Sequence, residues 1–556
     1  MKMEGCLAYS KIKERCLEPC GYAPAYEGEG EEELVCSFSD LHSYYVLEHG
    51  AKQKDFDAYC EKLVSCGFEQ YCAHASNQNR FATYTNGESI ISLSHISYRD
   101  TDRYTVCDVS YLLISVDSTQ FSALPPKCDR YQTVTTVQLT TDGSFFIIRL
   151  VDGRFLVIDS NLNRPNPIEL IYATLCEQNP LDGKPVVAAW MITHAHSDHV
   201  DALLALLEKY GDGIEIESLI QGFPGEESYV GKNYVEYDMD KESSWLTKRS
   251  RRLCSLLAQK MPHVKFVTAH IGQIFEYPEA RVEIVFTAEN LYRQQMIDTN
   301  MSSVVYKLTL PGGSLLALGD AVDLEARIIR KIHSADLMCD MVILAHHALN
   351  GGDTELYCNT GAKAAIWPND LESVLAKSWK DHYMLNHFDP QLVKHNFIIS
   401  RNDRVMTFYD GMSAEEIARF DRRIDAPAIN APDFAKRKQP KTVLTDRHLA
   451  QGFGLAPRFY GVGEDAEEMT VDQESKTYTL TFYGVTEYNY DDYCNTLKRD
   501  GYLRTDRMKT DSGIHSVHAS PQNAVFIDFN PSEAKMTVTV GGIGKDVLAV
   551  KSIHQG

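Results

Sequence analysis

A short polar cluster lies between an apolar run and an amphipathic pattern in the middle of the chain, within Met191–Leu206 (MITHAHSDHVDALLAL). The preceding run, Val186–Ile192, is apolar throughout and predicts a buried β-strand. The residues that follow predict a helix with one apolar face, formed by Val200, Leu203, Leu204, Leu206 and Leu207. The polar cluster is therefore expected at the turn from a strand into a helix.

Four side chains of this cluster can bind metal ions: His194, His196, Asp198 and His199. Alternate residues of an extended segment point to the same side, so His194 and His196 can converge on one ion. Asp198 and His199 begin the turn and can face a second ion. Neutral imidazoles with carboxylates suit zinc, manganese or iron, and an adjacent pair of such ions suits hydrolysis. The alternative, polar residues in an exposed turn, is weaker because of this spacing.

The pattern His194-x-His196-x-Asp198-His199 resembles the signature of the metallo-β-lactamase fold superfamily. This resemblance implies an α/β fold, a four-layered αββα sandwich with two divalent metal ions at one edge of its two sheets. Zinc is the expected metal, with manganese or iron as alternatives. The resemblance covers about residues 134–411, which is roughly half of the chain.

Two acidic residues at strand ends extend the resemblance. Asp159 follows the predicted strand Phe155–Ile158, and the resemblance implies that it orients the metal ligands from beside them. Asp320 ends a wholly apolar strand, where an ionised carboxylate needs a partner. A metal pair bridged by Asp320 is one such partner. The alternatives are that Asp159 simply terminates its strand and that Asp320 caps the next helix.

A second histidine pair follows the predicted strand Met341–Ala345. Together with Asn300-x-x-Ser303 and Gly319-Asp320, His346-His347 resembles the branch with the hydrolase domain of the competence DNA-uptake protein and choline-phosphate esterases. That branch usually has glycine where this chain has Ala348. His346 is expected to bind metal, with Asp198 and His347 in catalysis, although either histidine could be the ligand while the other contacts substrate or donates a proton. Asn300 is expected near the metals or the substrate.

The family also places a lone histidine ligand between the first cluster and Gly-Asp. His270 lies in this interval, but its context, a strand end before Gly272, does not match, and we expect it to be structural. The expected ligands are then His194, His196 and Asp320 for one ion, and Asp198, His199, Asp320 and His346 for the other. The first ion is expected to be less occupied.

Two segments near opposite ends of the chain are alike. FDAYCEKLVSCGF at 56–68 aligns without a gap with YDDYCNTLKRDGY at 490–502. Each predicts a helix, with a strand before it and hairpin-like alternation after it, so we interpret the pair as a duplicated α+β module. One helix on a few strands is marginal alone. We therefore expect each copy to pack on the other copy, on the hydrolase core or, as a homodimer contact, on a second chain.

The length of 556 residues accommodates two or three domains. The expected division is an N-terminal module at 1–125, a hydrolase domain at 132–420, a linker at 421–470 and a C-terminal module at 471–556. A net charge of −22 argues against an obligate nucleic-acid partner. No apolar run has the length of a membrane span or of a signal-peptide core, and the 14 cysteines form no CxxC pair, so a cytoplasmic protein without a membrane partner is expected.

The expected function is a metal-dependent hydrolase in which water activated by the metals attacks a phosphodiester or phosphate ester. This fold hosts several reactions, so hydrolysis of a lactone, lactam or thioester is an alternative. A non-catalytic protein whose modules bind a partner is another, weakened by the nearly complete ligand set. A redox diiron centre is disfavoured because flavin-linked relatives usually carry glutamate at the position of His196.

Overall fold

A computed structural model of the chain describes residues 23–24, 26, 31–36, 44–96, 110–118, 123–126, 138–142, 145–224, 239–291, 299–369, 384, 387–398, 405–407, 412–422, 424, 467–472, 474–475, 477–499, 502–510, 512–519 and 523–542. These residues form a mixed α/β protein with four sheets. The chain divides into two compact units, one with the N-terminal and central sheets and one with the C-terminal sheet. Most of the predicted linker at 421–470 lies outside the described residues, and the predicted domain boundaries stay predictions.

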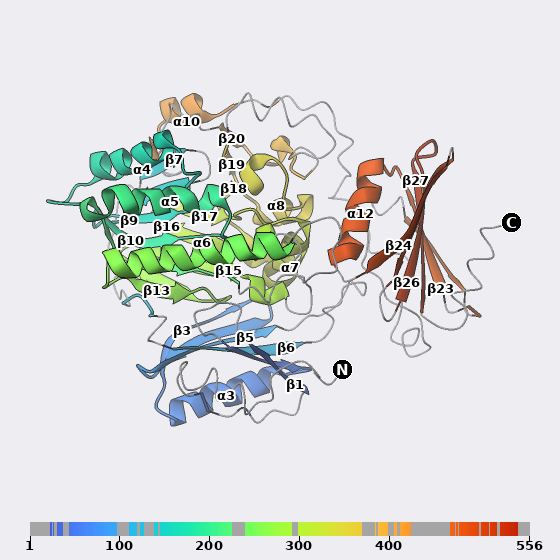
Figure 1. The fold of residues 1–556 in the computed structure, drawn as a ribbon, viewed down its shortest axis with the longest axis horizontal. Coiled ribbons are helices and arrows are strands. Elements are labelled where there is room, and N and C mark those ends of the chain that lie inside the picture. Colours follow the sequence, from blue (N-terminus) through green and yellow to red (C-terminus); the bar gives the residue numbers. More distant parts are fainter. Residues whose placement is uncertain are drawn as a thin grey trace. The chain divides into compact units, whose positions relative to one another are not determined.

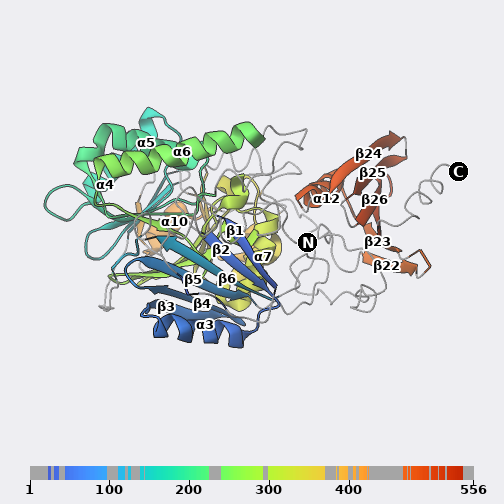
Figure 2. The same cartoon turned by 60° about the horizontal axis from the view of Figure 1, so that its bottom comes forward.

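The larger central sheet has eight strands in the order β13-β12-β10-β9-β8-β7-β21, with β11 beside β10. Their bounds are β7 Gln138–Asp142, β8 Phe145–Arg149, β9 Phe155–Ile158, β10 Val186–Met191, β11 Glu215–Ile216, β12 Ser218–Gln221, β13 Lys265–Thr268 and β21 Val405–Thr407. Strands β9, β10, β12 and β13 are parallel, so their carboxyl ends meet at one edge. Three helices lie side by side over this sheet (Figures 1 and 2): α4 Pro165–Gln178, α5 Ser197–Tyr210 and α6 Met239–Lys260.

The second central sheet has seven strands in the order β14-β15-β16-β17-β18-β19-β20. Their bounds are β14 Ile274–Tyr277, β15 Ala280–Phe286, β16 Val305–Leu310, β17 Gly313–Ala317, β18 Met341–Ile343, β19 Ala364–Trp367 and β20 His395–Ile398. Strands β17 to β20 are parallel, which again gathers their carboxyl ends at one edge. Helix α7 (Asp323–His333) contacts β15 and α8 (Thr354–Thr360), and helix α10 (Ala414–Phe420) contacts β20.

Side chains from both central sheets form one buried core. Phe146 and Met191 from the larger sheet and Tyr306 and Ile343 from the smaller sheet belong to the same apolar cluster. The hydroxyl of Tyr306 also donates a hydrogen bond of 2.8 Å to the carbonyl of Ile192, directly before the histidine cluster. The two sheets therefore pack on each other through a shared core; the full four-layered sandwich stays a prediction.

The N-terminal sheet has six antiparallel strands in the order β1-β2-β6-β5-β4-β3. Their bounds are β1 Glu31–Cys36, β2 Tyr44–His49, β3 Glu69–Ser76, β4 Asn79–Thr85, β5 Ser89–Ile96 and β6 Tyr111–Ser118. Helix α3 (Gln53–Ser65), which confirms the helix predicted for this segment, buries Phe56, Tyr59 and Leu63 against the sheet.

The N-terminal module also contacts the central part of the same unit. The side-chain amide of Asn79 donates to the carbonyl of Ile332 at 2.6 Å, and Ser76 Oγ lies 2.8 Å from His333 Nδ1. Gly272 has φ +79°, and a Cβ there would lie 2.2 Å from Cγ of Phe81. Only glycine allows this close approach, so the backbone at Gly272 packs directly against the side chain of Phe81 in the N-terminal module. The N-terminal copy of the module therefore contacts the central part of the chain, which is one of the three packing partners expected for it.

The C-terminal sheet repeats the N-terminal topology strand for strand. Its order is β22-β23-β27-β26-β25-β24, and α12 (Glu487–Arg499) lies between its second and third strands in the chain, as α3 does in the first module. The bounds are β22 Glu467–Asp472, β23 Thr477–Tyr483, β24 Leu503–Thr510, β25 Gly513–Ala519, β26 Asn523–Asn530 and β27 Lys535–Gly542.

The correspondence extends to an irregularity in the strand after the helix. The register shifts between Gln70 and Cys72 in β3, and at the matching place between Arg504 and Asp506 in β24. A β-bulge is a specific local feature rather than a general property of strands. The shared bulge therefore supports the interpretation of the modules as a duplication. Whether the two copies pair stays a prediction.

No helix in the described part of the chain is long and apolar enough to cross a membrane.

Candidate metal centre

Three turns meet where strands of the two central sheets end. The first follows β10 and carries the histidine cluster; His196 precedes α5 in an extended conformation, with φ −64° and ψ 157°. The second follows β17 and carries Asp320, and the third follows β18 and carries His346 and His347. The backbone N–H of His346 donates to the carbonyl of Gly319 at 3.0 Å, which ties the second turn to the third.

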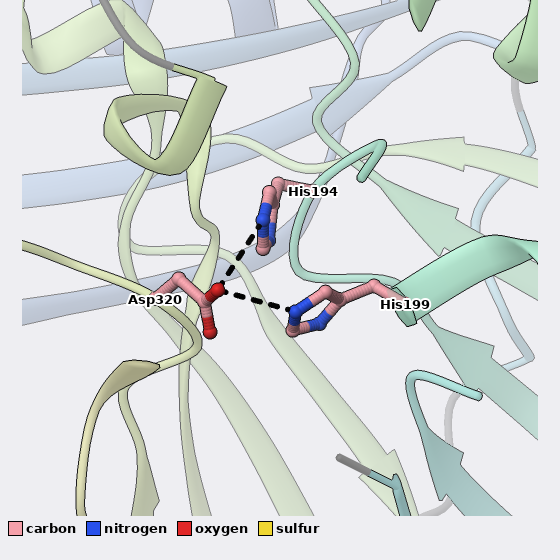
Figure 3. Close-up of side chains that lie close together, drawn as sticks. All are labelled: His194, His199 and Asp320. Atoms are coloured by element: carbon pink, nitrogen blue, oxygen red, sulfur yellow. Dashed lines mark ion pairs between the residues drawn. The ribbon is translucent and has the colours of Figure 1, made fainter. Parts of the chain in front are cut away.

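One carboxylate oxygen lies at the centre of the site. Oδ2 of Asp320 has four imidazole Nε2 atoms around it: His199 at 3.3 Å, His347 at 3.5 Å, His194 at 3.7 Å and His346 at 3.9 Å. Figure 3 shows two of these rings, His194 and His199, turned toward the carboxylate. Asp320 is only 3% exposed. Helix α7 begins at Asp323, so Asp320 does not cap it.

The described residues contain two groups of side chains that could hold a metal ion. One group is His194, His199 and Asp320; the other is Asp198, His199 and His347. Within each group the ligand atoms lie within 4.8 Å of one another. The structure therefore brings together distant residues that the sequence selected, although in a different grouping.

The grouping differs from the predicted sets at three histidines and at Asp320, which is in one group only although it was expected to bridge both ions. His199 takes part in both groups, whereas it was assigned to one ion. His196 is in neither group, and its Nδ1 lies 2.9 Å from Nε2 of His194. His347 rather than His346 joins Asp198 and His199, because the turn after β18 directs its Nε2 to within 2.9 Å of Asp198 Oδ2.

Asp159 lies behind His199, at the end of β9. Its Oδ2 is 2.8 Å from Nδ1 of His199 and accepts a hydrogen bond of 2.8 Å from the hydroxyl of Thr193. The backbone N–H of Thr193 donates to Oδ1 at 2.7 Å. Asp159 thus fixes the ring of His199 so that Nε2 faces Asp320. Thr193 was not selected from the sequence; its place directly before the motif was the available signal.

Asn300 lies in a buried 3-10 turn, η5 (Thr299–Ser302), before β16. Its Nδ2 is 3.5 Å from Nε2 of His346. The amide nitrogen can only donate, so Nε2 of His346 accepts this bond, and the two side chains form a second polar pair beside the carboxylate cluster.

The buried charges of the site stabilise one another. Burial raises the pKa of Asp320, but the charges of His199 and His347 outweigh burial and hold the pKa well below its ordinary value. Burial lowers the pKa of His199, but Asp320 and Asp159 raise it well above its ordinary value. Burial lowers the pKa of His194 well below its ordinary value, which keeps this ring neutral.

This donor set fits a divalent cation. Zinc binds neutral imidazoles and carboxylates, and a cation can replace the proton that His199 holds between two carboxylates. Nε2 of His199 is buried and, among the described residues, has no hydrogen-bond partner; it lies 3.3 Å from Oδ2 of Asp320, where a cation could take the place of its proton.

His270 makes a separate buried cluster. Its Nε2 lies 2.6 Å from Asp117 Oδ2 on β6, and its Nδ1 lies 2.8 Å from Glu289 Oε2. Neither metal group of the described residues includes it. This agrees with the structural role expected for His270, and it adds a charged contact between the N-terminal module and the central sheets.

Comparison with known proteins finds only weak similarity to solved structures. No protein-family model matches the chain. No curated protein matches it either. Among solved structures, the diiron β-hydroxylase CmlA from Streptomyces venezuelae is 11% identical, with a TM-score of 0.27, over 43% of this chain and 46% of that chain. The alignment therefore spans less than half of CmlA.

Two hydrolases are similar at the same level. Tm1679, a metal-dependent hydrolase of the β-lactamase superfamily, is 14% identical with a TM-score of 0.25, over 45% of this chain and 96% of that chain. AbOPH, a hydrolase in the β-lactamase superfamily, is 14% identical with a TM-score of 0.23, over 45% of this chain and 75% of that chain. Scores this low assign neither a family nor an activity.

Proposed function

We propose that the protein is a metal-dependent hydrolase of the metallo-β-lactamase fold superfamily that acts on a phosphodiester or phosphate ester. The observation that carries the proposal is the position of Asp320 Oδ2, within 3.3–3.9 Å of four imidazole nitrogens from two other turns. A carboxylate buried among imidazoles with no catalytic or metal role would be an expensive structural element. The branch with the competence-protein hydrolase domain remains the suggested affiliation.

His194, His199 and Asp320 would hold one ion, and Asp198, His199 and His347 would supply ligands for a second. Two divalent ions, with zinc as the first choice, would supply a lowered pKa for water and electrostatic stabilisation of developing negative charge. A single Nε2 lone pair binds one ion, so full occupancy of both positions needs a further ligand from His196 or His346. We therefore also propose that the two metal positions are unequally occupied.

The chain's own residues have distinct parts in the proposed reaction. Asp159 fixes the orientation of His199, and Oδ2 of Asp198 lies 2.9 Å from Nε2 of His347, with which it forms an ion pair. Burial raises the pKa of Asp198, but the hydrogen bond from His347 and the charge of His199 lower it below its ordinary value. Asp198 therefore stays ionised at neutral pH, where it can hold a cation or accept a proton.

The substrate class is supported by the polar groups beside the carboxylates. His346 is partly exposed, and its Nε2 accepts a hydrogen bond of 3.5 Å from the side-chain amide of Asn300, a group that carries two N–H donors. Donors of this kind, next to a dication site, suit the oxygens of a phosphate ester. A carbonyl substrate such as a lactone, lactam or thioester would need fewer such donors and is the second candidate.

A substrate panel tests this proposal. The purified full chain is stripped of metal, reloaded with zinc, manganese or iron, and assayed with bis-p-nitrophenyl phosphate, p-nitrophenyl phosphate, a lactone and a chromogenic lactam. We expect metal-dependent hydrolysis of a phosphoester that is lost in Asp320→Ala. Turnover of the carbonyl substrates alone would overturn the substrate class. Absence of metal-dependent turnover with every substrate would favour a non-catalytic, partner-binding protein.

A cytoplasmic location, the absence of an obligate nucleic-acid partner and a homodimer formed through the flanking modules belong to the same proposal. Size-exclusion chromatography with light scattering on the full chain and on a chain shortened before β22 tests the last point.

A further inference from the structure

Helix α6 places one arginine against the turn that carries the histidine cluster. Nη1 of Arg249 donates a hydrogen bond of 2.9 Å to the carbonyl of Ala195, and its Nε donates one of 2.7 Å to Oδ1 of Asp201. Ala195 lies between His194 and His196, and Asp201 lies in the second turn of α5. One guanidinium therefore joins the backbone between the two histidines to the helix that follows them.

The carbonyl that Arg249 holds lies in a short stretch without regular structure. Ala195 comes after β10 and before α5, and it is only 2% exposed. A buried carbonyl needs a donor, and a charged donor gives a stronger and more directional bond than a neutral one. The Ala195 carbonyl belongs to the peptide between Ala195 and His196, so holding it restricts ψ of Ala195 and φ of His196 and thereby how His194 and His196 lie relative to each other.

We propose that Arg249 is a positioning residue for the metal-binding turn: it fixes the Ala195 peptide plane and thereby sets the affinity and geometry of the site that contains His194. This inference rests on the proposed metal site. Lysine cannot replace arginine here, because a guanidinium presents several donors in a rigid fork, whereas an ammonium is a single point charge. Outer groups that orient ligands typically change metal affinity by about 10- to 100-fold when they are removed.

The chain offers a matched control on the same pair of helices. Arg252, also on α6, pairs with Glu208 on α5, at side-chain exposures of 64% and 48%. This ion pair links α6 to α5 as Arg249 does, but within the described part of the chain Arg252 makes no hydrogen bond or ion pair with the histidine turn. If Arg249 acted only by holding the two helices together, the two arginines would behave alike.

The experiment compares wild type, Arg249→Gln, Arg249→Lys and Arg252→Gln, each as the full chain freed of metal. Cobalt(II) is titrated while its visible d–d absorption is recorded, and competition with a chelator gives the dissociation constant. Thermal unfolding of the metal-free proteins is measured alongside. We expect Arg249→Gln to weaken cobalt binding by about tenfold or more, with an altered d–d spectrum. Arg252→Gln should stay within about twofold of wild type, as a surface ion pair contributes little.

The outcomes separate this inference from the proposed function. Wild-type affinity and spectrum in Arg249→Gln would overturn the positioning role while leaving the metal site intact. Equal weakening in Arg249→Gln and Arg252→Gln would assign the effect to helix packing and overturn it as well. No cobalt binding by wild type would overturn the proposed function and this inference together. Should Arg249→Gln fail to fold, Arg249→Lys takes its place, and wild-type affinity in that variant would have the same meaning.

Discussion

Nε2 of His347 lies 2.9 Å from Oδ2 of Asp198. The neighbouring His346 turns elsewhere: its Nε2 lies 3.5 Å from the side-chain amide of Asn300, and its side chain is 26% exposed against 15% for His347. The two adjacent histidines thus have different surroundings: His347 lies beside the carboxylate of Asp198, and His346 lies beside the amide of Asn300. This distinction gives them different expected roles.

His347→Gln is expected to weaken metal binding more strongly than His346→Gln. His347 belongs to a group with Asp198 and His199, so its loss removes a ligand, and we expect a decrease in affinity beyond the roughly 10- to 100-fold of an outer-group change. His346→Gln should retain metal and lower kcat. Metal content and phosphoester kinetics of both variants check this, and the reverse order of metal loss would assign His346 as the ligand.

Ala348→Gly is expected to stabilise the protein. Ala348 has φ +53°, in the left-handed region, where an L-residue other than glycine is disfavoured by about 1–2 kcal/mol. The added freedom of glycine in the unfolded chain offsets about 0.4–1 kcal/mol, so the free energy of unfolding should rise by up to about 1.6 kcal/mol.

Urea unfolding of the metal-free proteins measures this difference. Ala345→Gly is the matched control, because Ala345 is equally buried but has an ordinary φ of −63°, and this change should destabilise the protein. Equal destabilisation by the two glycine variants would show that the left-handed turn carries no strain.

His270→Gln is expected to destabilise the protein in a pH-dependent way. Burial lowers the pKa of His270, but the charges of Asp117 and Glu289 outweigh burial and raise it from 6.5 to about 10. A raised folded-state pKa stabilises the fold fully below about pH 6.5, and this contribution is lost as the pH rises through about 10. Removing one partner of a buried ion pair typically costs about 3–5 kcal/mol.

Urea unfolding at pH 6 and pH 9.5 measures the effect of His270→Gln, and we expect a larger loss at the lower pH. His263→Gln is the control, because His263 pairs with Glu215 at the surface and is half exposed. A loss that is the same at both pH values would contradict a protonated His270 between two carboxylates.

The local part of the site could be predicted from the sequence. The apolar run, the polar turn and the amphipathic helix are continuous in the chain, and the structure forms β10 and α5 from them. Asp320 and His347 could be selected because each directly follows an apolar strand. Their grouping could not be predicted, because it depends on how the turns after β10, β17 and β18 meet across two sheets.

Contacts between segments that lie far apart in the chain could not be predicted from the sequence either. Arg249 lies 54 residues after Ala195, and Asp117 lies 153 residues before His270, and no spacing pattern links either pair. The duplication could be predicted from the sequence, because Tyr59 and Tyr493 occur at the same place in an ungapped alignment. In the structure each of these tyrosines is buried in the core of its own module. What the alignment could not show was which surface each copy contacts.

The most direct test of the account is the metal content of the full chain. Wild type, Asp320→Ala and the control Asp340→Asn are reloaded with zinc, passed through a desalting column and analysed by mass spectrometry for zinc per chain. Asp340 is a carboxylate bonded to Ser314 and Lys363 and belongs to neither metal group. The account predicts about two zinc ions per chain in wild type, one of them more easily stripped than the other, the same content in Asp340→Asn, and in Asp320→Ala loss of at least the ion held by His194, His199 and Asp320. Zinc content near wild type in Asp320→Ala, or no zinc in wild type, would contradict it.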